Sequence, residues 1–89
     1  MKRIHVIIKG KVIGVFFRKF IKENADKLKI KGWVKNEKDY VEVVFEGKEV
    51  NLRKILSLCH RGPPSASVER LNFKEEIIKG EKSFKILKS

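Results

Sequence analysis

Residues 4–28 read IHVIIKGKVIGVFFRKFIKENADKL, and the hydrophobic period changes near the middle of this stretch. Ile4, Val6 and Ile8 alternate with mostly polar neighbours, and a period of two in β-branched residues predicts a strand. Ile7 is apolar on the second face, so we expect a central strand with a cover over that face. Further along, apolar residues recur at helical spacing, which predicts an amphipathic helix. Its apolar positions are Phe17, Phe20, Ile21, Ala25 and Leu28.

Downstream of this stretch, turn signals and periodicity predict a hairpin, a second helix and two more strands. The turn Glu37-Lys38-Asp39 joins the hairpin strands, and Gly62-Pro63-Pro64 stops the second helix. Leu52, Ile55, Leu56 and Cys59 share one face of that helix. The expected elements are strands over 32–36 and 40–45, a helix from about Glu49 to His60, and strands over 68–73 and 83–87.

The resulting order is β-α-β-β-α-β with a short terminal strand, which is the ferredoxin-like split β-α-β arrangement. We therefore predict an α+β sandwich with an antiparallel sheet and both helices on one face, as one domain over residues 1–89. Lys2, Arg3 and His5 interrupt the only early apolar run, and no segment approaches the ~20 apolar residues of a membrane helix. We expect a cytoplasmic monomer that makes no membrane contact.

The composition is strongly basic, with 22 lysines and arginines against 11 aspartates and glutamates and a net charge of +11. Such a field attracts anions in general and does not distinguish a nucleic acid, a phosphorylated metabolite and a membrane surface. Cys59 is the one cysteine, which excludes an intramolecular disulfide, a Cys-x-x-Cys pair and a cysteine-based zinc cluster. Its helical position predicts core packing. His5 has no acidic or nucleophilic neighbour in sequence, so we expect a spectator role for it.

The loop over residues 10–16 joins a strand to a helix and carries Gly10 and Gly14, an arrangement suited to holding an anion. Glycine permits unusual backbone angles and close approach, and successive N–H groups can then form a nest. The following helix adds its own unpaired N–H groups and its positive dipole end, so the anion would lie over residues 13–17. Arg18 lies in the first helical turn, from which its planar guanidinium can reach the same anion. The pattern is neither G-x-G-x-x-G nor Walker A, so nucleotide binding of those kinds is not supported.

Two blocks of sequence resemble the acylphosphatase family. Residues 10–18, GKVIGVFFR, follow the family signature G-x-V-Q-G-V-x-F-R. Residues 32–36, GWVKN, follow the second family block, G-W/Y-V-x-N, and residues 62–68 carry a weaker third cue, G-P-x-x-A-x-V. The blocks occur in the family's order, and the resemblance covers essentially the whole chain.

The resemblance implies an enzyme that hydrolyses carboxyl–phosphate anhydrides, with an acyl phosphate as substrate and inorganic phosphate as product and inhibitor. It implies that Arg18 binds the phosphate and that Asn36 positions the attacking water, with no metal and no cofactor. Backbone amides would hold the phosphoryl oxygens, namely those of Ile13, Gly14, Val15, Phe16 and Phe17. Nucleic acid is not an expected partner of such an enzyme.

Two departures from the family pattern leave alternatives open. Ile13 stands where the family usually has glutamine. If that side chain helps to brace the loop, the cradle here is either looser or braced by packing, and if only the backbone N–H contacts phosphate, little changes. The turn after Asn36 is about one residue shorter than the usual N-x-x-D-G-x-V. The alternative function is a non-catalytic module on the same fold that binds phosphate or RNA. The RNA interpretation ranks second because the aromatic-rich sheet motifs of RNA-recognition domains are absent.

Overall fold

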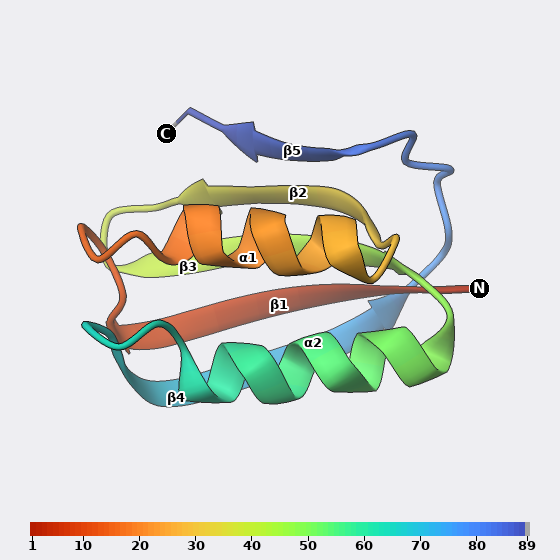
Figure 1. The fold of residues 1–89 in the computed structure, drawn as a ribbon. Coiled ribbons are helices and arrows are strands. Elements are labelled where there is room, and N and C mark those ends of the chain that lie inside the picture. Colours follow the sequence, from red (N-terminus) through yellow and green to blue (C-terminus); the bar gives the residue numbers. More distant parts are fainter. Residues whose placement is uncertain (89) are drawn as a thin grey trace.

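The computed structural model describes residues 1–88, which form a five-stranded sheet with two helices packed on one face (Figure 1). In chain order the elements are β1 (Lys2–Lys11), α1 (Phe17–Lys27), β2 (Lys31–Asn36), β3 (Tyr40–Gly47), α2 (Glu49–Arg61), β4 (Ser67–Glu76) and β5 (Phe84–Leu87). This order confirms the predicted α+β ferredoxin-like fold. Within the described residues, no helix has both the length and the apolar character needed to cross a membrane.

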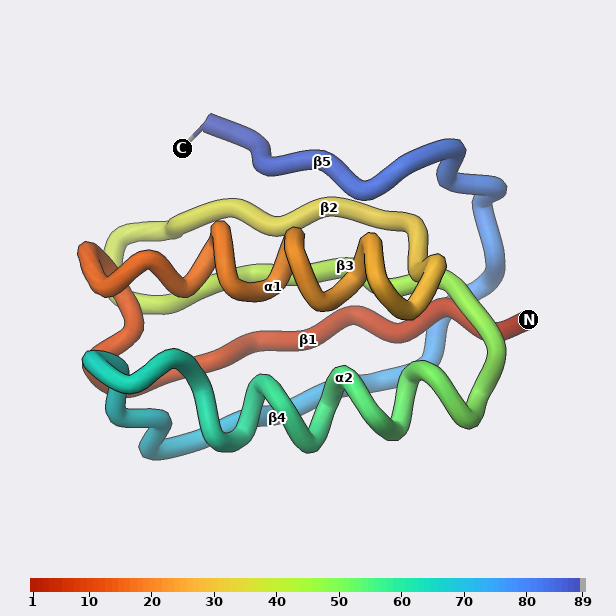
Figure 2. The backbone as a smooth tube through the Cα atoms, in the orientation of Figure 1, coloured from red at the N-terminus to blue at the C-terminus, as the bar shows by residue number. Residues whose placement is uncertain are grey.

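The strands lie side by side in the order β4-β1-β3-β2-β5 (Figure 2). The first four pair antiparallel, as predicted, with Val6 opposite both Val43 and Phe73. β5 instead runs parallel to β2, with Phe84 opposite Gly32, so the complete sheet is mixed. The antiparallel prediction therefore holds for four strands and does not extend to β5. A hairpin cannot join neighbouring parallel strands, and β5 is reached from β4 at the opposite edge of the sheet.

The core lies between the sheet and the helices because each element turns one apolar face toward the other layer. The helix faces predicted from periodicity are confirmed. The buried residues are Phe17, Ile21 and Ala25 in α1 and Leu52, Ile55 and Cys59 in α2, with Phe20, Leu28 and Leu56 packed at the margin. Burial raises the pKa of the Cys59 thiol to about 12, so this side chain stays protonated at neutral pH. The prediction that Cys59 packs in the core is confirmed.

The opposite face of the sheet, which we call the open face, carries no helix (Figure 1). β1 alternates between the two faces, burying Ile4, Val6 and Ile8 and turning His5 and Ile7 to the open face. The central position predicted for β1 is confirmed. The expected cover over Ile7 is wrong, since this residue is half-buried and borders an open hollow.

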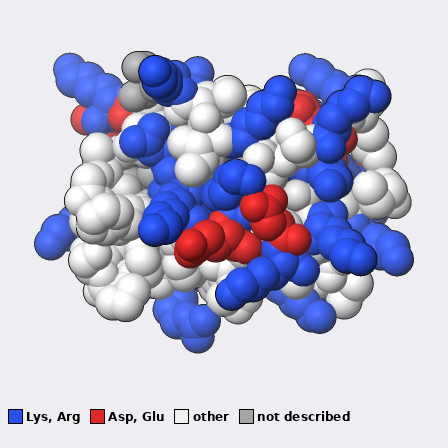
Figure 3. Space-filling view, turned by 45° about the horizontal axis from the view of Figure 1, so that its top comes forward, with Lys and Arg blue, Asp and Glu red and all other residues white. Residues whose placement is uncertain are grey.

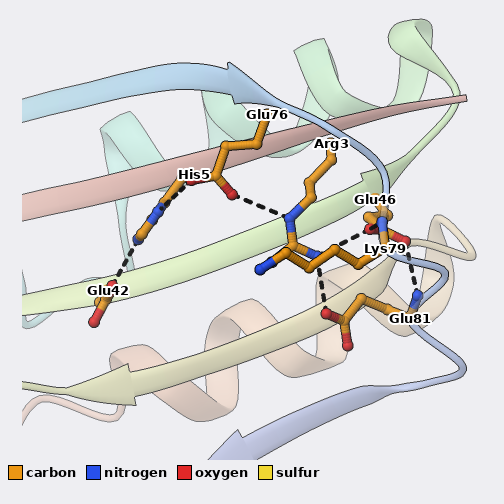
Figure 4. A network of polar contacts seen from close by, with 7 residues as sticks. All are labelled: Arg3, His5, Glu42, Glu46, Glu76, Lys79 and Glu81. Carbon is orange, nitrogen blue, oxygen red and sulfur yellow. Dashed lines mark hydrogen bonds and ion pairs between the residues drawn. The ribbon is translucent and has the colours of Figure 1, made fainter.

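Residues 77–83, which we call the crossover segment, connect β4 at one edge of the sheet to β5 at the other (Figure 4). Glu46 of β3 anchors this segment, because its carboxylate accepts hydrogen bonds from the N–H groups of Lys79 and Glu81, both at 2.8 Å. Arg3 of β1 pairs with the carboxylates of Glu46 and Glu81 at 2.9 Å each, and with Glu76 at 3.1 Å. Arg3 and Glu46 are each only 3% exposed. The crossover segment is therefore fixed by a buried ion cluster.

The groups of this cluster stabilise one another in their charged forms. Burial acting alone would raise the pKa of Glu46, but hydrogen bonds from Lys79, Arg3 and the Glu81 N–H outweigh it and lower that pKa below its usual value. The pKa of Glu76 is also lowered, first by its hydrogen bond with His5 and then by Arg3. Deprotonation of these carboxylates is therefore coupled to folding.

His5 has two acidic partners that its sequence neighbourhood did not reveal. Its Nδ1 lies 3.0 Å from Glu76 of β4, and its Nε2 lies 2.6 Å from Glu42 of β3 (Figure 4). Both partners are far away along the chain and reach His5 only through strand pairing. His5 thus belongs to the polar network of the open face.

Candidate active site

The loop between β1 and α1 is held in place by two of its own apolar side chains. Val12 and Val15 are 1% and 7% exposed, whereas Ile13 is 39% exposed. Packing of the two valines therefore braces the loop, and the isoleucine side chain that departs from the family pattern contributes little to that bracing. Before the loop, a Cβ at Gly10 would lie 2.3 Å from the Ser67 carbonyl oxygen, so only glycine lets β1 approach β4 this closely.

The backbone of the loop leaves a row of N–H groups unpaired at the start of α1. Gly14 has φ 74° and Phe16 has φ 61°, a left-handed conformation that caps the helix without a side-chain hydrogen bond. Across the described residues, the N–H groups of residues 13–17 donate no hydrogen bond to another protein group. These donors coincide with the positive end of the helix dipole, which is a favourable setting for an anion.

Arg18, the second residue of α1, is half-buried beside this row of donors. Its Nη1 donates to the carbonyl oxygen of Leu87 at 3.4 Å, a long contact that directs the side chain toward β5. Arg18 takes part in none of the ion pairs formed within residues 1–88. Most of its five N–H donors are therefore free to bind a phosphate with the bidentate geometry of a guanidinium.

Asn36, the last residue of β2, carries an unsatisfied polar atom. Its Oδ1 is buried without a hydrogen-bond partner, and no other buried side-chain nitrogen or oxygen of residues 1–88 lacks one. A buried acceptor without a donor costs free energy, so such an atom marks a place where a ligand or water can donate. The short turn that follows is closed by a 2.8 Å hydrogen bond from the Glu37 N–H to the Tyr40 carbonyl. Asn36 accordingly keeps its register opposite Val41.

A hollow of about 350 Å³ brings these groups together at one end of the molecule. Gly14, Phe16 and Phe17 line it from the loop and helix start, Arg18 from α1, and Asn36 from β2. Ile13 and Val15 belong to the same loop but do not line the hollow. The remaining lining residues are Val12, Lys19 and Ile86. The structure thus places both predicted catalytic side chains beside three of the five predicted amide positions.

Lysines border the candidate site on the side of Asn36. A second hollow, of about 410 Å³, also touches Asn36 and is lined by Lys35, Glu37, Lys38 and Lys88. Glu37 lies 2.9 Å from the Lys35 ammonium and raises the pKa of Lys35. Lysines and arginines are spread over the face shown in Figure 3, where acidic side chains gather in small groups. Residues 1–88 contain no group of three or more His, Cys, Asp or Glu side chains placed to hold a metal ion.

Comparison with known proteins identifies the family to which this site belongs. The family model described as acylphosphatase matches residues 4–86. The chain belongs to the acylphosphatase family. An acylphosphatase of Pyrobaculum aerophilum is 49% identical over 90 residues, which cover 98% of this chain and 95% of that protein. Another, of Syntrophus aciditrophicus, is 44% identical over 89 residues, with coverages of 98% and 93%.

The fold agrees with this family assignment. The crystal structure of acylphosphatase from Bacillus subtilis matches with a TM-score of 0.95 at 35% identity, and the match covers 98% of this chain and 99% of that chain. The resemblance inferred from residues 10–18 and 32–36 is confirmed, and so is the prediction of an acylphosphatase enzyme. The individual roles of Arg18, Asn36 and the loop amides stay predictions.

Two lining residues, Lys19 and Ile86, were missed by sequence reasoning. Lys19 lies on the polar face of α1 and resembles any solvated helix lysine. Ile86 reaches the hollow because β5 runs parallel beside β2, with Ile86 opposite Val34. Its alternation with charged neighbours predicts a strand, but the partner of a strand is not visible in its own sequence.

Proposed function

We propose that this acylphosphatase hydrolyses acyl phosphates by direct in-line attack of water on phosphorus. Arg18 and the loop amides hold the phosphoryl group, and Asn36 holds the water. The observation that carries this proposal is the row of unpaired N–H groups over residues 13–17. Three of these positions, Gly14, Phe16 and Phe17, line the same hollow as Arg18 and Asn36, whose Oδ1 also lacks a partner.

The phosphate-binding half of the mechanism is electrostatic. The N–H groups at the start of α1 and the Arg18 guanidinium present donors from two directions to the oxygens of a phosphoryl group. Charge on the three equatorial oxygens in the transition state is stabilised by such fixed donors, and little covalent help is required. Because the donors are already oriented before substrate arrives, they need not reorganise during the reaction.

The water-binding half rests on Asn36. Its amide accepts one hydrogen bond from the water and leaves a lone pair of the water oxygen aimed at phosphorus. A new P–O bond forms to the water oxygen while the bond from phosphorus to the acyl oxygen breaks, and the bonding electron pair leaves with the carboxylate. The proton lost by the water passes to a phosphoryl oxygen, so the products are a carboxylate and inorganic phosphate. Carboxylate is a good leaving group, so the site needs no separate general acid.

The proposal is tested by measuring hydrolysis of benzoyl phosphate, with and without inorganic phosphate, in wild type, Arg18→Ala and Arg70→Ala. Arg70 is an exposed arginine on β4 and serves as the matched control. We expect phosphate-inhibited turnover in wild type and a fall in kcat/KM of about 10³-fold in Arg18→Ala. The Arg70→Ala variant should keep its kcat/KM within about twofold, as expected for a distant surface position.

Full activity in the Arg18→Ala variant would contradict the assignment of Arg18. Absence of turnover in the wild type, together with phosphate binding that depends on Arg18, would instead indicate a non-catalytic phosphate module. Isothermal calorimetry with inorganic phosphate measures that binding directly.

A further inference from the structure

We propose that Phe16 determines substrate specificity and that the acyl group lies in an apolar groove extending from Phe16 to Pro63. This groove selects acyl phosphates whose acyl group is neutral and apolar, such as an aromatic ring or a branched alkyl chain. The inference rests on the proposed function, because it places the acyl group of the same substrate whose phosphate binds at the proposed site.

The groove adjoins the phosphate hollow. A separate hollow of about 420 Å³ is lined by Phe16, Lys19, Phe20, Glu23 and Pro63. It shares Phe16 and Lys19 with the hollow that contains Arg18 and Asn36. A substrate whose phosphate is bound at the start of α1 can therefore extend past Phe16 without leaving the protein surface.

The direction of the acyl group follows from in-line geometry. Attacking water and leaving group lie on opposite sides of phosphorus, so the acyl group points away from Asn36. The loop before α1 lies between the end of β2, which carries Asn36, and the turn over residues 62–66 (Figures 1 and 2). That turn is packed on the start of α1, since a Cβ at Gly62 would lie 3.1 Å from Cε2 of Phe17. The leaving group consequently departs toward Phe16 and Pro63.

The exposure and backbone conformation of Phe16 are those expected of a side chain that contacts a ligand. It is 79% exposed, and its φ of 61° is a left-handed conformation that costs a bulky residue free energy. An aromatic ring that is exposed to water in this conformation contributes little packing energy to offset that cost. Phe20 forms the adjoining wall and is fixed edge-on against Phe17, with ring centroids 5.9 Å apart. An apolar acyl group placed here would cover both phenylalanines.

The charges beside the groove favour an uncharged acyl group. Lys19 and Glu23 lie four residues apart on α1 and have opposite signs, so they supply no net charge. The basic hollow containing Lys35 and Lys38 touches Asn36 and is therefore on the water side of phosphorus. A second phosphate on the acyl group would point away from those lysines. Neutral apolar acyl groups accordingly fit this groove better than phosphorylated ones.

The direct test uses binding without turnover. We expect wild type to bind benzylphosphonate about tenfold more tightly than methylphosphonate by calorimetry, because only the benzyl compound reaches the groove. Phe16→Asn should remove most of this preference, since asparagine tolerates the left-handed conformation but lacks the ring. Phe16→Tyr should retain it. Phe73→Asn is the matched control, because Phe73 is 56% exposed on β4, away from the groove, and should keep the full preference.

Equal affinities for the two phosphonates in wild type, or a preference that survives Phe16→Asn, would overturn the assignment of the groove as the acyl-binding site. The ratio of kcat/KM for benzoyl phosphate to that for acetyl phosphate gives a second readout, in which effects on the phosphate cradle cancel. We expect this ratio to fall about tenfold in Phe16→Asn. Turnover without any ring preference would refute the groove and leave the proposed function standing. A phosphonate preference without turnover would support the groove and refute the proposed function.

Discussion

The two ends of the β-sheet use similar residues in opposite ways. At the crossover end, Arg3 is 3% exposed and contacts three carboxylates, while Glu46 accepts two backbone N–H groups as well as Arg3. At the other end, Arg18 is half-buried with a single long contact to a carbonyl, and Asn36 has a buried oxygen without a donor. Arg3 is fully engaged in a network of ion pairs, whereas most N–H donors of Arg18 have no protein partner.

This difference separates groups that are satisfied within the fold from groups that the fold leaves largely without protein partners. A satisfied buried network fixes the path of the crossover segment and leaves nothing for a substrate. Unpaired donors and acceptors cost stability in the free protein, and a bound phosphate and water can satisfy them. Substitutions at the two ends should therefore affect different measurements.

The largest contrast is expected between Arg3 and Arg18. Arg3→Met should lower the free energy of unfolding by about 3 kcal/mol, because it leaves the buried Glu46 carboxylate without its cation. Arg18→Ala should change that free energy by less than about 0.5 kcal/mol. Urea denaturation followed by circular dichroism measures both. Arg53→Met is the control, since its pair with Glu49 is exposed to solvent and should contribute little to stability.

If Arg3→Met unfolds at the same urea concentration as wild type, the ion cluster does not anchor the crossover segment. If folded Arg3→Met loses turnover while keeping its stability, the separation between the two ends is wrong.

Asn36→Ala sharpens the comparison at the end that carries the candidate active site. We expect kcat for an acyl phosphate to fall about 100-fold, because the attacking water loses its positioning partner. Inhibition by inorganic phosphate should change much less, and the free energy of unfolding should not fall, because the substitution removes an unsatisfied buried oxygen. Steady-state kinetics and urea denaturation test these outcomes, with Asn72→Ala on the exposed strand β4 as control. A loss of phosphate affinity with unchanged kcat would reassign Asn36 to binding.

Acid should weaken the crossover end first. The pKa of Glu46 is lower in the folded protein than its usual value, so its contribution to stability is complete above about pH 4.5. That contribution disappears as pH falls through the lowered pKa. We expect Tm to drop as pH falls below about 4.5, and to drop less in Glu46→Gln, which has no carboxylate to protonate there. Equal slopes for the two proteins would show that other carboxylates dominate the acid response.

The smallest effect concerns Cys59, which belongs to the hydrophobic core beneath α2. Its thiol is fully buried, and burial raises its pKa to about 12, so alkylation by iodoacetamide at pH 8 should be undetectable in the native protein. The same reagent should modify Cys59 fully in concentrated urea. Mass spectrometry distinguishes the two states, and rapid labelling without urea would mean that α2 opens readily from the sheet.

The sequence predicted the loop, both helices and the candidate catalytic pair, because each depends on local signals. Gly14 marks a backbone turn, the apolar period changes near Phe17, and Arg18 and Asn36 sit in recognisable blocks. The parallel pairing of β5 with β2 could not be predicted from local signals. The alternation around Phe84 and Ile86 is the same whether the strand pairs parallel or antiparallel. The carboxylate partners of Arg3 and His5 were hidden for a similar reason, because they come from other strands.

Short-range patterns in this chain specify the order of its elements, the faces they bury and the types of side chain available at the site. Propensity, glycine conformation and hydrophobic period act over a few residues, so these properties are visible along the chain. Pairing of distant strands specifies the rest. It brings Asn36 to the loop before α1, buries the Asn36 oxygen without a donor and encloses Arg3 among carboxylates. These features depend on register and packing between residues far apart in sequence, and only the folded sheet brings such residues together.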